Sequence, residues 1–150
     1  MSEVLREIGS IARALDGISN LEFKELDLTK GQYLYLVRIQ ENPGIIPEHL
    51  AQLLRVDAST CSRALQKLTK QGFIEKHQLA HNKKNQILYV TAKGQEAADF
   101  IQRENRYSEK QALAGLTKDE VATLTGFLQH IRENIDKDWQ LVKKGQHREY

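Results

Sequence analysis

The hydrophobic period of this chain changes once, within residues 47–91, and the change constrains the fold more than any other feature. Pro47 is preorganised for a first helical turn and starts a short helix whose apolar residues, at helical spacing, are Leu50, Leu53 and Leu54. A second helix is expected over 58–71, because its apolar residues also recur every three or four positions. Asp57 is a suitable N-cap for that helix, so a tight turn separates the two helices.

The period then becomes that of β-strands. Gly72 supplies the stop of the second helix, and residues 73–79 and 87–91 are rich in strand-forming side chains. The polar segment 80–86 lies between them, so the pair predicts a β-hairpin with that segment as its tip. A short helix, a tight turn, a second helix and a hairpin, in that order, make a winged helix-turn-helix.

Further helices are expected on both sides of this region. One covers residues 3–15, and another begins near residue 32, where Thr29 is the expected cap and Gln32 can reach back to it. A long helix should follow Gly94, and a last helix should be capped by Thr117 with Glu120; its apolar stripe is Val121, Leu124, Phe127 or Leu128, Ile131, Ile135 and Trp139. The expected fold class is therefore mainly α with a small β-hairpin.

The polar face of the helix over 58–71 fits DNA. Its apolar face (Cys61, Ala64, Leu65 and Leu68) should pack inward, which turns the polar residues outward or to the flanks. A helix fits the major groove, where short hydroxyls permit close approach and arginine can pair with a guanine edge. The residues expected to contact DNA on this helix are Ser59, Thr60, Ser62, Arg63, Gln66, Lys67 and Lys70.

The charge distribution favours the same partner. The chain carries a net charge of only +2, yet residues 55–93 hold eight lysines and arginines against two acidic residues. A basic middle between mildly acidic ends is typical of a segment that binds a polyanion. At the hairpin tip, Asn82, Lys83 and Lys84 are expected to reach the minor groove or the DNA backbone.

Other function classes lack their signatures. No glycine-rich phosphate loop, serine nucleophile motif or zinc-ligand pair is present, so we predict no catalytic residues, no cofactor and no metal. Cys61, the single cysteine, faces inward and is expected to pack rather than react. No apolar run reaches the roughly 18 residues of a membrane span, and no signal peptide is apparent, which favours a cytoplasmic protein without a membrane partner.

The chain resembles the MarR family of bacterial transcription regulators, in particular its SlyA-like branch, over nearly its whole length. The residues that carry the resemblance are Leu28-Thr29-x-x-Gln32, Leu50-Ala51-x-x-Leu54, Val56-Asp57-x-Ser59-Thr60-x-x-Arg63-x-x-x-x-Leu68, Gly72-Phe73-Ile74 and Val90-Thr91-x-x-Gly94. One departure is the hairpin tip, where the family has Asp-x-Arg and this chain has Asn82-Lys83-Lys84. Since lysine lacks the planar fork of arginine, we expect this tip to add mostly nonspecific affinity.

The resemblance implies a homodimer that binds a pseudo-palindromic operator in double-stranded DNA and acts as a repressor. Residues 1–27 and 95–150 would form the dimerisation helices, and residues 28–94 the winged helix-turn-helix. A small amphipathic or phenolic effector would bind between these regions and change the spacing of the two recognition helices, which are the two copies of the helix over 58–71. Two alternatives stay open at this stage: a winged-helix module for protein–protein interaction, because fold does not fix function, and a metal-responsive regulator.

Overall fold

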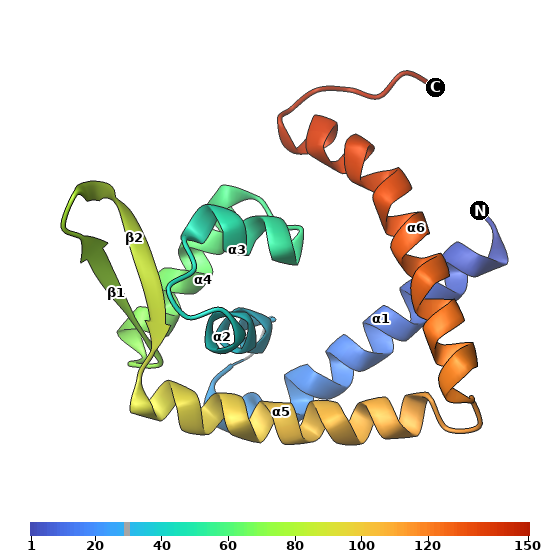
Figure 1. Ribbon diagram of the computed structural model, residues 1–150, viewed down its shortest axis with the longest axis horizontal. Coiled ribbons are helices and arrows are strands. Elements are labelled where there is room, and N and C mark those ends of the chain that lie inside the picture. Colours follow the sequence, from blue (N-terminus) through green and yellow to red (C-terminus); the bar gives the residue numbers. More distant parts are fainter. Residues whose placement is uncertain (29–30) are drawn as a thin grey trace. The chain divides into compact units, whose positions relative to one another are not determined.

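The computed structural model describes residues 1–28 and 31–150, and at residues 82–85 it describes the backbone alone. The chain divides into two compact units, Met1–Ser108 and Glu109–Tyr150. Helices and one small two-stranded sheet make up the described part of the chain, as Figure 1 shows. The predicted fold class, mainly α with a small hairpin and a winged helix-turn-helix, is confirmed.

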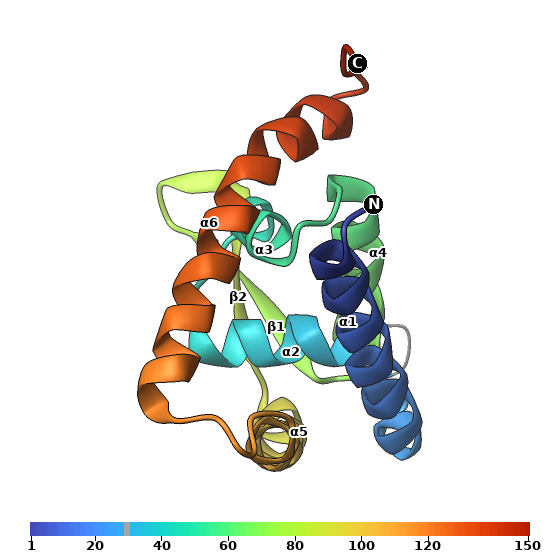
Figure 2. The same ribbon diagram turned by 90° about the vertical axis from the view of Figure 1, so that its right-hand side faces the viewer.

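The winged helix-turn-helix occupies the middle of the first unit. Its helices are α2 (Gln32–Glu41), α3 (Pro47–Leu54) and α4 (Ala58–Lys70), and its strands are β1 (Ile74–Leu79) and β2 (Asn82–Val90). Each of the three helices packs on the other two, and the hairpin packs on all three through one or other of its strands. Both views place α2 between α3 and α5, the helix that follows the hairpin (Figures 1 and 2).

The hairpin differs from the prediction at its tip. The two strands pair antiparallel, with Ile74 opposite Val90, and the register shifts between Gln78 and Leu79. Because β2 already begins at Asn82, the expected tip over 80–86 was too long. The polar residues indicated a loop, but the backbone of a short solvent-facing hairpin can form strand pairing whatever side chains it carries.

A third segment extends the sheet by one bridge that the sequence did not predict. Ile45, in the loop between α2 and α3, pairs with Leu88 of β2. The amide of Gly44 also donates to the Leu88 carbonyl at 2.8 Å, and the Leu88 amide donates to the Ile45 carbonyl at 3.0 Å. These bonds fix the hairpin to the loop that leads into the helix-turn-helix.

One continuous core lies beneath these elements. The buried apolar side chains of the winged region are Tyr33, Tyr35, Leu36, Val37, Ile39, Leu50, Ala51, Cys61, Leu65, Leu68, Phe73, Ile74 and Leu88. Leu53, which the spacing placed on the apolar stripe of α3, is instead 47% exposed. In a helix of only eight residues, Leu50 and Leu54 already fill the narrow face that packs on the core.

The helix α5 (Ala92–Ala112) follows the hairpin directly, and a close backbone approach fixes its start. The Thr91 hydroxyl donates to the Gly72 carbonyl at 2.6 Å and accepts from the Gly94 amide at 3.1 Å. A Cβ on Gly94 would stand 1.9 Å from the Phe73 carbonyl oxygen, so only glycine fits there. This contact explains the spacing Val90-Thr91-x-x-Gly94 that the sequence presents.

The helix α1 (Glu3–Glu22) is longer than the expected segment 3–15. Ile18 follows Leu15 by three residues and continues the stripe, and the single Gly17 costs too little to end a helix. For α2 the observed N-cap is Gly31, at φ +76°, whereas the predicted cap Thr29 lies outside the described residues. Hydrogen bonds between α2 and α5 hold α2 in place, and in one of them the Gln40 side-chain amide donates to the Asp99 carboxylate at 2.8 Å.

The second unit is built around α6 (Lys118–Lys143). Its predicted capping box is confirmed: the Glu120 amide donates to the Thr117 hydroxyl at 3.2 Å, and the Thr117 amide donates to the Glu120 carboxylate at 2.8 Å. No residue of this fully described helix is buried, although it carries a continuous apolar stripe. Of the described helices, none is both long and apolar enough to cross a membrane.

Candidate nucleic-acid interface

The helix α4 has one face that is committed to the core. Cys61, Leu65 and Leu68 are buried, and the Cys61 thiol lies 3.7 Å from the Pro47 carbonyl oxygen at the start of α3. Ala64 is half-buried against the same core. The prediction that Cys61 faces inward and packs is confirmed, and its burial withholds the thiol from solvent.

The opposite face of α4 holds the predicted DNA contacts. Ser59, Ser62, Arg63, Gln66, Lys67 and Lys70 are exposed, and Thr60 is half-buried. All of them come from one helix of 13 residues, so the structure brings the predicted residues of α4 onto a single surface. The side chains of Asn82, Lys83 and Lys84 lie outside the described ones.

Three side chains at the N-terminal end of this face form a chain of hydrogen bonds. Asp57 accepts the Thr60 amide at 2.7 Å and the Thr60 hydroxyl at 2.8 Å. The Arg63 guanidinium in turn donates to the Thr60 hydroxyl oxygen at 3.4 Å. Sequence reasoning identified Asp57 only as a helix cap; the three-residue spacing from 57 to 60 to 63 is the signal that could have revealed the relation.

Asp57 is an anion at neutral pH on this surface. The Thr60 amide and hydroxyl, and the nearby Arg63 guanidinium, hold the pKa of the Asp57 carboxyl below its ordinary value. Tyr35 of α2 lies behind this end of α4, and burial raises the pKa of its phenol. The N-terminal end of α4 therefore presents a charged pair, Asp57 and Arg63, bridged by one hydroxyl.

The C-terminal end of α4 is tied to the segment that follows α1. The Gln71 side-chain amide donates to both the carbonyl and the carboxylate of Asp27, each at 2.9 Å. Lys67 forms an ion pair with the same carboxylate at 3.9 Å, so Asp27 competes with phosphate for this lysine. The sequence did not reveal this contact, because 40 residues separate Asp27 from Lys67. Lys70 is exposed and is the better placed of the two lysines for phosphate.

The turn between α3 and α4 is held by an arginine. Arg55 adopts the left-handed conformation at φ +55°, which is uncommon for a residue with a side chain. Its guanidinium donates to the Gln52 carbonyl at 2.6 Å and so covers the C-terminal end of α3. The arginine offsets part of the backbone strain by this bond, and the turn fixes the angle at which α4 leaves α3.

Histidines and carboxylates do not gather into a metal site among the residues that the structure describes. On the hairpin, the His77 imidazole lies 3.1 Å from the Glu75 carboxylate, and its ring meets the Tyr89 ring edge-on at 5.2 Å between centroids. This cluster is a local surface contact of β1 and β2. It holds no third metal ligand among the described residues.

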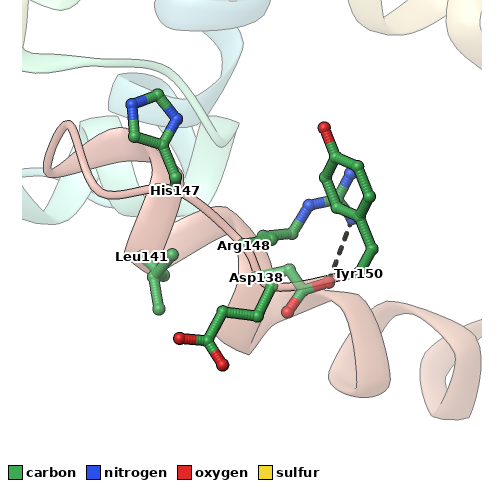
Figure 3. A pocket seen from close by; sticks show the side chains of 6 residues that line it. Asp138, Leu141, His147, Arg148 and Tyr150 are labelled. Carbon is green, nitrogen blue, oxygen red and sulfur yellow. Dashed lines mark hydrogen bonds and ion pairs between the residues drawn. The ribbon is translucent and has the colours of Figure 1, made fainter.

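A shallow pocket of about 520 Å³ lies in the second unit, between the end of α6 and the tail that follows it (Figure 3). Asp138 and Leu141 line it from α6, and the other lining residues are His147, Arg148, Glu149 and Tyr150. The Arg148 guanidinium donates to the Asp138 carboxylate at 3.1 Å, which folds the tail back along the helix. None of the predicted site residues lines this pocket.

Comparison with known proteins settles the family. The MarR family model matches residues 28–85. The HTH-type transcriptional regulator YybA of Bacillus subtilis (strain 168), which is described as uncharacterized, is 53% identical over 150 residues, and the match covers all of both chains. The chain belongs to the MarR family. The predicted resemblance is thereby confirmed, as is the predicted class of transcription regulators.

Two solved structures agree with this MarR-family assignment. A MarR family transcriptional regulator from Listeria monocytogenes, solved in complex with a 26mer DNA, is 54% identical and superposes with a TM-score of 0.95 over the whole of both chains. A SlyA-like transcription regulator from the same species is 54% identical, with a TM-score of 0.90 and full coverage of both chains. The fold of this MarR-family chain is thus that of a protein solved on DNA.

Proposed function

We propose that this MarR-family chain is a sequence-specific DNA-binding transcription regulator, a repressor, that binds a pseudo-palindromic operator as a homodimer. The observation that carries the proposal is the outward face of α4, where serines, an arginine, a glutamine and lysines stand exposed over a buried apolar face. Such a face matches base edges and phosphates in the major groove. The structure of the 54% identical Listeria protein with a 26mer DNA supports the same partner.

The dimer part of the proposal is supported by the terminal helices. In α1 the exposed apolar side chains are Val4, Leu5, Ile11, Leu15, Ile18 and Leu21; in α6 they are Leu124, Phe127, Leu128, Ile135 and Val142. A soluble chain rarely leaves contiguous apolar surface of this kind open to water. A second copy would cover both stripes by two-fold symmetry, with residues 1–27 and 95–150 as the dimerisation region and 28–94 as the DNA-binding region.

In this proposal the chain has no catalytic activity and acts on chromosomal DNA. Its relatives are transcription regulators, and a regulator of this kind acts by occupying DNA rather than by transforming a substrate. A bacterial regulator of transcription works in the cytoplasm, where the DNA is. A small amphipathic or phenolic effector would modulate binding by changing the separation of the two recognition helices; this part of the proposal rests on family resemblance.

Selection of bound duplexes from a random DNA pool tests the proposal. We expect an enriched motif with two inverted half-sites, whose centres are about one helical turn (~10 bp) apart. Enrichment of no motif would overturn the proposal and favour the protein-interaction module instead. Repeating the selection with zinc or manganese, and with a chelator, separates a metal-responsive regulator from one that needs no metal.

A further inference from the structure

The hydrogen bonds at the start of α4 connect a carboxylate that precedes the helix to the arginine expected to read a base. We propose that Asp57 is a positioning residue: through the Thr60 hydroxyl it holds the Arg63 guanidinium in one orientation, and so sets base specificity. The inference rests on the proposed function. It assigns Thr60 a different role from the one expected for its exposed neighbours Ser59 and Ser62, which is direct contact with DNA.

The direction of the hydrogen bonds carries the argument. A threonine hydroxyl has a single hydrogen, and Thr60 gives it to the Asp57 carboxylate at 2.8 Å. An ionised carboxylate can only accept, so the polarity of this bond cannot reverse. The Thr60 oxygen therefore turns its lone pairs outward, where Arg63 donates to it at 3.4 Å. Arginine can only donate, so the hydrogen bonds run in one direction, from Arg63 to Thr60 and from Thr60 to Asp57.

The three-residue spacing holds the Asp57 end of this series of hydrogen bonds in place. Asp57 also accepts the Thr60 backbone amide at 2.7 Å, so the carboxylate is held by the first turn of the helix itself. Residues three apart lie on one helix face, which places Asp57, Thr60 and Arg63 in a line along the side of α4. An arginine side chain in water samples many rotamers, and each restraint before binding lowers the entropy lost when it meets a base.

The charge of Asp57 adds a second effect on the same surface. The Asp57 side chain is exposed beside the expected DNA contacts. A carboxylate repels phosphate at every DNA sequence alike, so it weakens nonspecific binding. Arg63 gains from the restraint only where a guanine lies in reach. The repulsion lowers both affinities alike and leaves their ratio unchanged, so the restraint on Arg63 is the effect that widens the ratio between affinity for the operator and affinity for random DNA.

Thr60→Val tests the positioning role, because valine keeps the shape of threonine and removes the hydroxyl. Affinity is measured for two probes: the duplex most enriched by the wild-type chain from a random pool, and a shuffled duplex of the same length and composition. We expect the ratio of the two affinities to fall about threefold to tenfold, the effect of losing one hydrogen bond of ordinary strength. Thr60→Ser restores the hydroxyl and should restore the ratio.

Thr69→Val is the matched control on the same helix. The Thr69 hydroxyl donates to the Leu65 carbonyl of its own helix at 2.7 Å and takes no part in the chain of Asp57, Thr60 and Arg63. This variant should keep the wild-type ratio. A ratio for Thr60→Val that equals those of wild type and Thr69→Val would overturn the inference.

Asp57→Asn gives an independent reading, since asparagine is also a good N-cap and should leave the helix folded. The neutral amide removes the repulsion of phosphate and the fixed acceptor of the Thr60 hydrogen. Affinity for the shuffled duplex should therefore rise while the ratio falls. An equal rise on both duplexes would reduce Asp57 to a charge effect and overturn the positioning role. If the wild-type chain enriches no motif, the proposed function itself fails, which is a distinct outcome.

Discussion

The helices α4 and α6 have the same kind of sequence and opposite environments. Both begin with a side-chain cap and carry apolar residues at helical spacing. In α4 the apolar face is buried by α2, α3 and β1, whereas Phe127 in the stripe of α6 is 64% exposed. The difference teaches that a helical pattern identifies the face that must be covered, but not the chain that covers it.

The faces that the two helices leave exposed differ in kind: that of α4 is polar, whereas α6 exposes its apolar stripe. The polar face of α4 carries residue types that recognise DNA, and the chain uses the other face of that helix as its own scaffold. No residue in the apolar stripe of α6 is buried within its own unit. We infer that the fold of one chain buries the apolar face of α4 and leaves its polar face for DNA, while a second copy of the chain buries the apolar stripe of α6.

The largest expected effect comes from the stripe of α6. Leu124→Glu combined with Leu128→Glu places two charges where apolar surface should meet its copy. We expect the dimer to dissociate in sedimentation velocity, and affinity for the enriched duplex to fall about 100-fold or more, because two linked half-sites bind far more tightly than one.

Ala122→Glu combined with Gly126→Glu is the matched control for that variant. These positions lie on the opposite side of α6, and a Cβ on Gly126 would meet no atom within 4 Å. The control should remain a dimer and bind as the wild type does. Loss of the dimer in the control, or a dimer that survives the charges at Leu124 and Leu128, would contradict the contrast between the two helices.

A smaller effect is expected in the core beneath α4. Leu68 is fully buried, so Leu68→Ala should lower the free energy of unfolding in urea by about 2–5 kcal/mol. The folded fraction should still sediment as a dimer, because the lost contact lies inside one chain. Leu53→Ala, at an exposed position of α3, should change the free energy by less than about 0.5 kcal/mol. Similar losses for both leucines would disprove the core placement of Leu68.

The smallest expected effect is the pH dependence of the stability that the Asp57 N-cap gives to α4. The folded state holds the pKa of Asp57 below 3.8, so the ionised carboxylate stabilises the fold at neutral pH. This contribution is lost as pH falls through the lowered pKa. The difference in unfolding midpoint between wild type and Asp57→Asn should therefore be constant above about pH 5 and shrink below about pH 4. A difference that stays constant down to pH 3 would contradict this role.

The sequence predicted the elements whose causes are local. The Thr117–Glu120 capping box, the Asp57 cap and the inward phase of Cys61 depend on residues a few positions apart, and all three are present in the structure. The predictions for the start of β2 and for Leu53 were wrong, because strand pairing and the width of a packing face depend on neighbours distant in the sequence.

The candidate site was predicted in part for the same reason. The outward residues of α4 follow from helix phase alone, so their exposure could be predicted. The ion pair of Lys67 with Asp27 and the bridge of Ile45 with Leu88 join distant segments and left no local pattern. The relation of Asp57 to Arg63 had a local signal in its spacing, but the functions of both residues had to be considered together to see it.

The measurement that tests the central claim most directly is the affinity of Arg63→Ala for the enriched duplex and for the shuffled one. If the outward face of α4 reads DNA, the variant should lose about 1–3 kcal/mol on the enriched duplex, lose much less on the shuffled duplex, and remain a dimer. Lys137→Ala, which removes one positive charge from α6, should leave both affinities near wild type. Unchanged binding of the enriched duplex by a folded, dimeric Arg63→Ala would contradict the account.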